Sequence, residues 1–134
     1  MDKQSTPGYS GKPLMEKLNW KPEFQSLAIN LPDNLPDFDI FSSFDSHISA
    51  GKQYDFIIIF QTDHSLLKEA LYNILPQLAP RGILWVCRPK QTSQIPTNIT
   101  ENSLRDILLP IGLVDIKVCA ISEDWSGLKF MRRR

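Results

Sequence analysis

The segment YDFIIIFQT, residues 54–62, decides the fold. It is a run of β-branched and aromatic residues without polar alternation, which is typical of a strand covered by helices on both faces. We therefore expect it to form the centre of a sheet. Thr62 or Asp63 can cap the helix that follows, which ends near residues 79–82. The apolar stripe of that helix consists of Leu66, Leu67, Ala70, Leu71, Ile74, Leu75 and Leu78.

This helix and the residues after it predict two crossover connections between strands. ILWVCRP, residues 83–89, reads as the next strand, parallel to the first through a right-handed connection. Thr100 can cap a second helix that ends at Gly112. Its predicted buried face consists of Leu104, Ile107, Leu108 and Ile111. Residues 113–121 then form a strand, and only five residues separate it from GLKFMRR, which requires an antiparallel hairpin.

The N-terminal part predicts smaller elements. Residues 1–11 are polar and read as a flexible lead-in, and residues 12–134 form one domain. A short helix has Pro13 in its first turn and ends at Asn19, and residues 24–31 and 39–44 read as strands. The predicted fold is a single-domain Rossmann-like α/β fold. Its sheet is mixed and mostly parallel, with an antiparallel C-terminal hairpin strand and helices on both faces.

Two resemblances to known families agree with this architecture. The strand, helix, LAPRGIL turn at 78–84, strand, helix and terminal hairpin resemble the second half of class I S-adenosylmethionine-dependent methyltransferases. The chain also resembles a small bacterial family described as domain of unknown function 3052. That resemblance lies in PLMEKLNWKP (13–22), LWVCRPKQTSQIPTNIT (84–100) and GLVDIKVCAISEDWSGLKF (112–130). It implies a cytoplasmic protein but no particular reaction.

Composition limits the classes of partner. The chain has 15 Lys and Arg and 15 Asp and Glu, so its net charge of zero does not favour nucleic acid or an anionic membrane surface. We read the terminal Arg132, Arg133 and Arg134 as a solvated end. No apolar run approaches the roughly 20 residues of a membrane helix. Cys87 and Cys119 lie in apolar segments, which favours reduced thiols and a cytoplasmic location. The oligomeric state is left open.

The segment after the first predicted strand argues against an ordinary cofactor turn. Dinucleotide and methyltransferase folds place glycines there, because glycine allows a tight turn and close approach to the cofactor. This chain has no glycine between Gly11 and Gly51, and Pro32 and Pro36 each remove a backbone donor. We therefore predict no cofactor, with S-adenosylmethionine as the alternative. Asp45 stands where a ribose-binding carboxylate would lie, but we favour it as the N-cap of a turn through residue 50.

The sequence favours no catalytic residue and no metal site. His47 and His64 have no companion at a metal-ligand spacing. His64 follows Asp63 at the carboxyl end of a predicted strand, where a general base would be useful. No nucleophile or oxyanion donor is identifiable near it, so we read it as a residue of the first helical turn.

The polar loop after the strand at 83–89 is the candidate binding site. Cations and hydroxyls leave the carboxyl end of a strand here, and the helix beginning near Thr100 points its free N–H groups the same way. The terminal hairpin can add an aromatic face and another cation. The candidate residues are Arg88, Lys90, Thr92, Ser93, Thr100, Trp125 and Lys129. The plainer reading is an ordinary solvated loop, with Trp125 packed over the sheet edge.

The function predicted from sequence is a non-catalytic binding or interaction module that recognises a small anionic ligand or an anionic group on a protein at this loop. The alternative is a transferase that binds S-adenosylmethionine or a nucleotide through an atypical cofactor loop. A third reading is a purely structural partner that pairs through an exposed edge strand.

Overall fold

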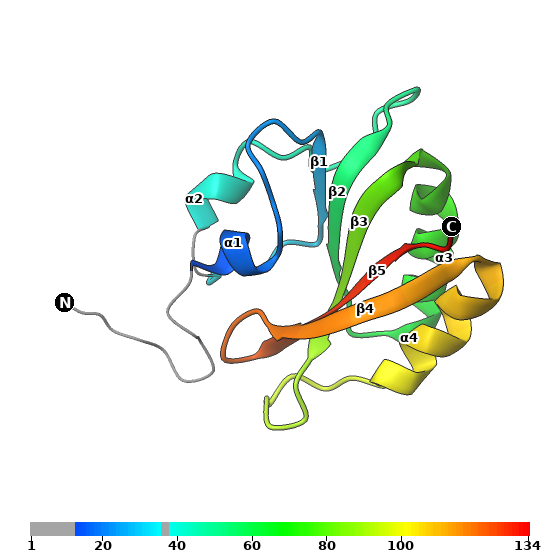
Figure 1. Ribbon diagram of the computed structural model, residues 1–134. Coiled ribbons are helices and arrows are strands. Elements are labelled where there is room, and N and C mark those ends of the chain that lie inside the picture. The colour runs from blue at the N-terminus through cyan, green and yellow to red at the C-terminus, as the bar shows by residue number, and fades with distance from the viewer. Residues whose placement is uncertain (1–12, 36–37) are drawn as a thin grey trace.

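A five-stranded mixed sheet forms the centre of the molecule (Figure 1). The computed structural model describes residues 13–35 and 38–134, so the predicted lead-in at 1–11 lies outside the described residues. The strands are β1 (Ser26–Ile29), β2 (Tyr54–Phe60), β3 (Leu78–Pro89), β4 (Leu113–Ala120) and β5 (Trp125–Arg132). Their spatial order is β1-β2-β3-β5-β4.

The pairing of the strands confirms the predicted fold class. β1, β2 and β3 are parallel, and β5 runs antiparallel to both β3 and β4. The central strand is β3, however, because the terminal hairpin adds two strands beyond it. The expectation that residues 54–62 form the middle of the sheet is therefore wrong by one strand.

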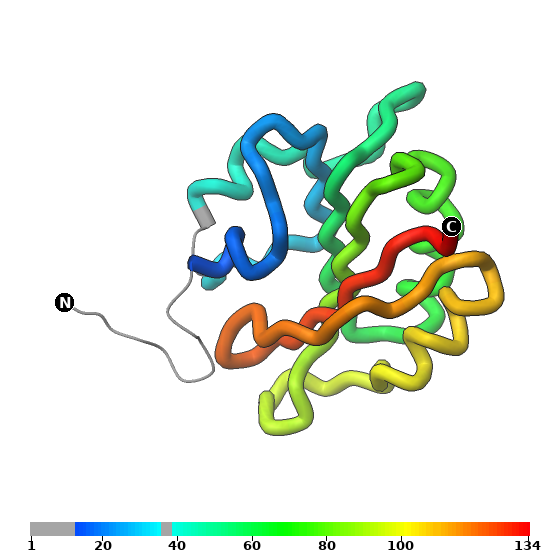
Figure 2. Tube along the Cα trace, viewed as in Figure 1, coloured from blue at the N-terminus to red at the C-terminus, as the bar shows by residue number. Residues whose placement is uncertain are grey.

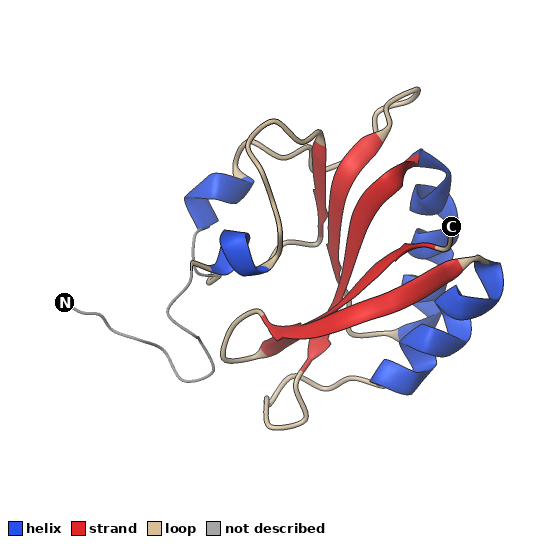
Figure 3. Ribbon diagram, viewed as in Figure 1, coloured by secondary structure: helices blue, strands red, loops and turns tan. Residues whose placement is uncertain are grey.

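Helices cover both faces of the sheet, as predicted (Figures 1 and 3). α3 (His64–Ile74) and α4 (Glu101–Leu108) lie on one face, and α1 (Leu14–Lys17) and α2 (Phe38–Phe41) lie on the other. Two apolar clusters result. One contains Leu67, Leu71 and Leu104 against the sheet, and the other contains Leu14, Leu18 and the fully buried Trp85. Alternate residues of the central strands therefore point into different cores.

The segment predicted as a strand at 39–44 is helical instead. α2 is a single turn, after which the hydroxyls of Ser42 and Ser43 donate to the carbonyls of Asp39 and Ile40. These local hydrogen bonds satisfy the backbone without a neighbouring strand. The one trace of extended pairing is a parallel bridge between Asp45 and Leu27 of β1.

The bounds of two other segments also differ from the prediction. β3 begins at Leu78 rather than residue 83, because α3 ends at Ile74 and one turn of 3₁₀ helix (Leu75–Gln77) leads directly into the strand. Leu66 and Ile111 were assigned to buried helical faces but are 55% and 40% exposed. Leu66 lies in the first turn of α3, and Ile111 lies in the 3₁₀ turn Leu109–Ile111 that replaces the last turn of α4. No helix in the part of the chain that the structure describes is long and apolar enough to cross a membrane.

Candidate functional site

The strand order contains a topological switch point between β1 and β2, where the chain changes the side of β1 on which the next segment pairs. After β1, the chain moves outward to the bridge at Asp45, and it then returns to place β2 on the other side of β1. Open α/β sheets bind ligands outside the carboxyl ends of the strands at such a point. The edge formed by the ends of β1 and β2 is therefore the candidate site.

Asn30 makes the turn that leaves β1. Its φ of 58° is in the left-handed region, which asparagine tolerates better than other residues with a Cβ. Its side-chain nitrogen Nδ2 donates to the Phe60 carbonyl of β2 at 3.1 Å, which joins the two strand ends. Asp33 and Asn34 follow in an exposed turn. The missing glycine therefore does not prevent a tight turn here, because Asn30 adopts the left-handed conformation in its place.

The carboxyl end of β2 is closed by the loop that follows β3 (Figure 2). Thr97 Oγ1 and the Asn98 N–H donate to the Thr62 carbonyl at 2.8 and 3.3 Å, and Asn98 Oδ1 accepts from the His64 N–H at 2.7 Å. Asp63 caps α3 by accepting from the Leu66 N–H, which confirms one of the two predicted caps. The N-terminus of α3 is thus held by protein groups. Thr97 and Asn98 were missed, because no sequence pattern links them to a helix 35 residues away.

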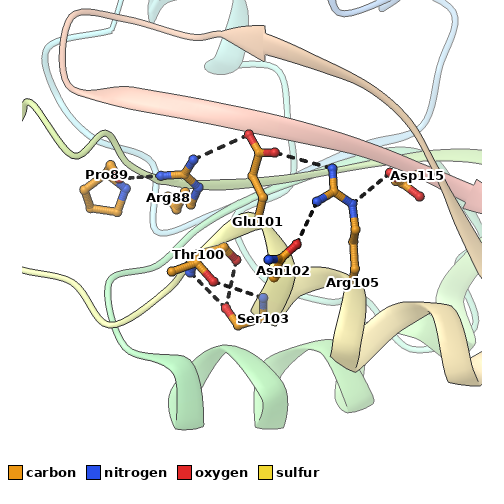
Figure 4. Close-up of polar contacts among 8 residues, drawn as sticks. All are labelled: Arg88, Pro89, Thr100, Glu101, Asn102, Ser103, Arg105 and Asp115. Carbon is orange, nitrogen blue, oxygen red and sulfur yellow. Dashed lines mark hydrogen bonds and ion pairs between the residues drawn. The ribbon is translucent and has the colours of Figure 1, made fainter.

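Arg88 belongs to an ionic network between α4 and the sheet (Figure 4). Its Nη2 lies 3.5 Å from Glu101 Oε2, and Arg105 contacts Glu101 Oε1 at 3.4 Å and Asp115 Oδ2 at 3.0 Å. The hydrogen bond that Arg105 donates to Asp115 lowers the pKa of Asp115 and raises the pKa of Arg105. The two guanidinium groups face two carboxylates, so this network carries no net positive charge for an anionic ligand.

Thr100 is the N-cap of α4, as predicted. Its Oγ1 accepts from the Ser103 N–H at 3.1 Å, and Ser103 Oγ accepts from the Thr100 N–H at 2.9 Å. This capping box uses the hydroxyl that was predicted to help bind a ligand (Figure 4). Thr100 and Arg88 line a pocket of about 340 Å³, together with Glu101 and Arg105.

The other loop residues lie in a different place. Thr92 and Ser93 line a separate pocket of about 550 Å³ with Glu123 and Asp124, whose carboxylates oppose anion binding. The Lys90 N–H donates to the Asp124 carbonyl at 2.8 Å, and Ser93 Oγ accepts from the Ile95 N–H. The loop is therefore tied to the β4–β5 turn.

Trp125 and Lys129 lie on the opposite face of the sheet. Along β5 alternate side chains change face, so these two point toward α1 and α2 while Ser126, opposite Arg88, points toward α4. Trp125 is 8% exposed and its ring meets that of Phe60 edge to face, at 5.2 Å between centroids. The structure therefore brings Arg88 and Thr100 together but does not unite the seven predicted residues in one site.

Asp45 neither caps a helix nor offers a carboxylate without partners. Its Oδ2 accepts from Tyr54 Oη at 2.6 Å and Lys52 Nζ at 2.8 Å, with Ser49 Oγ at 3.5 Å. The bonds from Lys52 and Tyr54 lower its pKa. The predicted N-cap is thus corrected to a clamp between the bridge on β1 and the start of β2. Among the described residues, no group of three or more His, Cys, Asp and Glu side chains could hold a metal ion.

Comparisons with solved structures agree on the fold. A ribosomal protein L11 methylase from Lactobacillus delbrueckii matches 90% of this chain and 75% of its own, with a TM-score of 0.58 and 10% identity. LepI in complex with SAM matches 98% of this chain and 50% of its own, with a TM-score of 0.58 and 13% identity. The Bacillus subtilis M1A22 tRNA methyltransferase TrmK matches 90% of this chain and 65% of its own, with a TM-score of 0.54 and 14% identity. The chain thus spans between half and three quarters of these proteins. No family model and no curated protein sequence matches.

These matches correct two predictions. The chain was expected to be a non-catalytic anion-binding module without a cofactor, yet the solved structures that share its fold are described as methyltransferases and as a complex with SAM. The resemblance to domain of unknown function 3052 stays a prediction. The structure and the comparisons therefore establish a single Rossmann-like α/β fold with a mixed sheet, which this chain shares with the ribosomal protein L11 methylase and with LepI.

Proposed function

We propose that the chain binds S-adenosylmethionine at the carboxyl ends of β1 and β2 and serves as the cofactor domain of a transferase. The observation that carries this proposal is the left-handed turn at Asn30, at the switch point of the sheet. A turn of that conformation lets the chain leave β1 sharply, which is the task of the first glycine in the usual cofactor loop.

The side chains near this turn suit the polar groups of the cofactor. Asp33 and Asn34 are exposed beyond Asn30. Carboxylates accept hydrogen bonds from ribose hydroxyls and from an ammonium group. Pro32 removes one backbone donor, so we assign binding to these side chains more than to a row of backbone N–H groups. When bound, S-adenosylmethionine supplies a methyl group activated by the adjacent sulfonium.

The loop after β3 and the Trp125–Phe60 contact support the carboxyl ends of the strands at this site. Thr97 and Asn98 fasten the long loop to Thr62, and the edge-to-face contact of Trp125 with Phe60 gives an apolar support behind the strand ends. Long loops in compact domains are often functional. We therefore assign residues 90–99 to the wall of the cofactor site rather than to an anion site of their own.

Thermal unfolding with S-adenosylmethionine and S-adenosylhomocysteine tests the proposal. At a hundredfold excess over Kd, a ligand of the native state adds about 2.7 kcal/mol of apparent stability. We expect both compounds to raise the Tm of the wild-type chain, and methionine alone to leave it unchanged.

Two asparagine variants make the test specific to the site. Asn30→Val places a β-branched residue in the left-handed region and should remove the response, while Asn19→Val has the same strain at φ 65° but lies at the end of α1 and should keep it. A cooperative wild-type transition that neither adenosyl compound moves contradicts the proposal, and so does an equal response in the two variants.

A further inference from the structure

On the face of the sheet under α1, two lysines lie opposite each other, and no carboxylate of the described residues pairs with either of them. Lys117 on β4 and Lys129 on β5 are directly opposite each other in the antiparallel pair. Both side chains reach toward α1, where Lys117 Nζ donates to the Lys17 carbonyl at 3.0 Å and Lys129 Nζ donates to Asn19 Oδ1 at 2.9 Å. Like charges directly opposite each other destabilise a strand pair.

Lys129 is the more unusual of the two. It is 8% exposed, and lysine is almost never so buried unless an anion pairs with it. Within residues 13–35 and 38–134, neither Lys117 nor Lys129 forms an ion pair, and the acceptors that they reach are neutral. Burial, and next the charge of Lys117, lower the pKa of Lys129. Burying the Lys129 ammonium costs free energy, and no carboxylate in the described part of the chain offsets that cost.

A third lysine belongs to the same place. Lys17 and Lys117 are both close enough to the Cys119 thiol to act on its pKa, which burial nonetheless raises. Cys119 lies on β4 and packs against the same core as α1. Three separate elements, α1, β4 and β5, therefore direct a cation to one small region.

The geometry of this cluster points to a bound anion. We propose that Lys17, Lys117 and Lys129, with Asn19, form a binding site for a phosphate group on the α1 face of the sheet. The ammonium groups of Lys117 and Lys129 have three donors each, and the contacts described here use one donor of each group. A doubly charged phosphate offsets both the opposed lysines and the buried charge. Lys117 and Asn19 are exposed, so the site is open to solvent.

This site is independent of the cofactor site proposed above. It lies on the face covered by α1, and Lys129 pairs with Trp85, in the interior of β3 rather than at its carboxyl end. A plainer role for the lysines is to fasten α1, through the Lys17 carbonyl and the Asn19 side chain. That role predicts a loss of stability in lysine variants but no response to phosphate.

Thermal unfolding in inorganic phosphate, with sodium chloride adjusted to constant ionic strength, distinguishes the two roles. We expect a saturable rise of the wild-type Tm, by roughly 4 °C for each kcal/mol of binding free energy in a domain of this size. Lys117→Met and Lys129→Met should lose the rise. Lys68→Met is the matched control: Lys68 is an exposed lysine on α3, across the sheet, and this variant should respond as the wild type does.

Two outcomes overturn the proposal. One is a wild-type Tm that does not rise or does not saturate with phosphate, and the other is an equal rise in all four proteins, which places phosphate elsewhere. Lys117 is exposed, so its variant provides the decision if Lys129→Met does not fold. S-adenosylmethionine is left out of these measurements, so the result does not depend on the cofactor proposal.

Discussion

Gly127 shows how closely one residue can be fitted between neighbours. It lies in β5 between Cys87 and Cys119 of the flanking strands, and a Cβ there would be 3.0 Å from Trp85 and 3.1 Å from Ile121. Trp85 cannot move aside easily, because it is fully buried and its Nε1 donates to the Leu18 carbonyl. We expect Gly127→Ala to lower the free energy of unfolding by about 1–3 kcal/mol in urea denaturation. A cost no larger than that of Ser126→Ala, on the other face of β5, would contradict the tight fit.

We expect Lys129 to make the free energy of unfolding depend on pH in the alkaline range. Its folded pKa is lowered, so between that pKa and the unfolded value near 10.5 the unfolded chain holds the proton that the folded chain has lost. The free energy of unfolding should therefore rise with pH in that window. In phosphate-free buffer, we expect urea denaturation to show this rise in the wild type and in Lys68→Met, and a smaller rise in Lys129→Met. Equal slopes in all three would show that Lys129 titrates normally.

At this scale the sequence predicted residue types better than residue roles. The cap at Asp63 and the end of the first helix near Asn19 were predicted from local chemistry, and both are present. The left-handed conformation of Asn30 and the burial of Lys129 were not predicted, because both depend on segments that are distant in sequence.

At the scale of the element, α4 depends on its N-terminal cap. Thr100 and Ser103 satisfy two backbone N–H groups that the helix itself cannot. We expect Thr100→Ala to lower the free energy of unfolding by about 1 kcal/mol. Chemical denaturation measures this, and Thr92→Ala in the preceding loop is the control, since Thr92 caps no helix. A variant as stable as the control would mean that solvent replaces the cap without cost.

The elements predicted best are those with a one-dimensional signature. β2 and α3 were recognised because buried strands and amphipathic helices have clear periodicity. The strand predicted at 39–44 was wrong because a segment of four to six mixed apolar and polar residues fits the period of a strand as well as that of a helix. The hydrogen bonds from the serine hydroxyls to the carbonyls three residues earlier stabilise a turn of helix instead. The same ambiguity hid the extension of β3 back to Leu78.

At the scale of the whole molecule, the sequence predicted the class of sheet but not its switch point. The parallel crossovers and the antiparallel hairpin follow from connection lengths. A single bridge at Asp45 places the segment after β1 on the side of β1 away from β2, and no sequence pattern predicts this bridge. The candidate site depends on that bridge, so it became visible only in three dimensions.

The ion pairs that join elements should make the stability of the whole domain depend on acid pH. Asp115 accepts from Arg105 and Asp45 accepts from Lys52 and Tyr54, and these bonds hold both carboxyl pKa values below the unfolded value of 3.8. Their contribution is complete above 3.8 and is lost as pH falls through the lower folded values. We expect the free energy of unfolding to fall in that range, and to fall less in Asp115→Asn. Asp106→Asn, an exposed residue of α4 with the same change of charge, should behave as the wild type. Urea denaturation from pH 5 to about pH 2 measures the difference, and parallel curves for the two variants would show that the Arg105 pair does not stabilise the fold, as is common for exposed ion pairs.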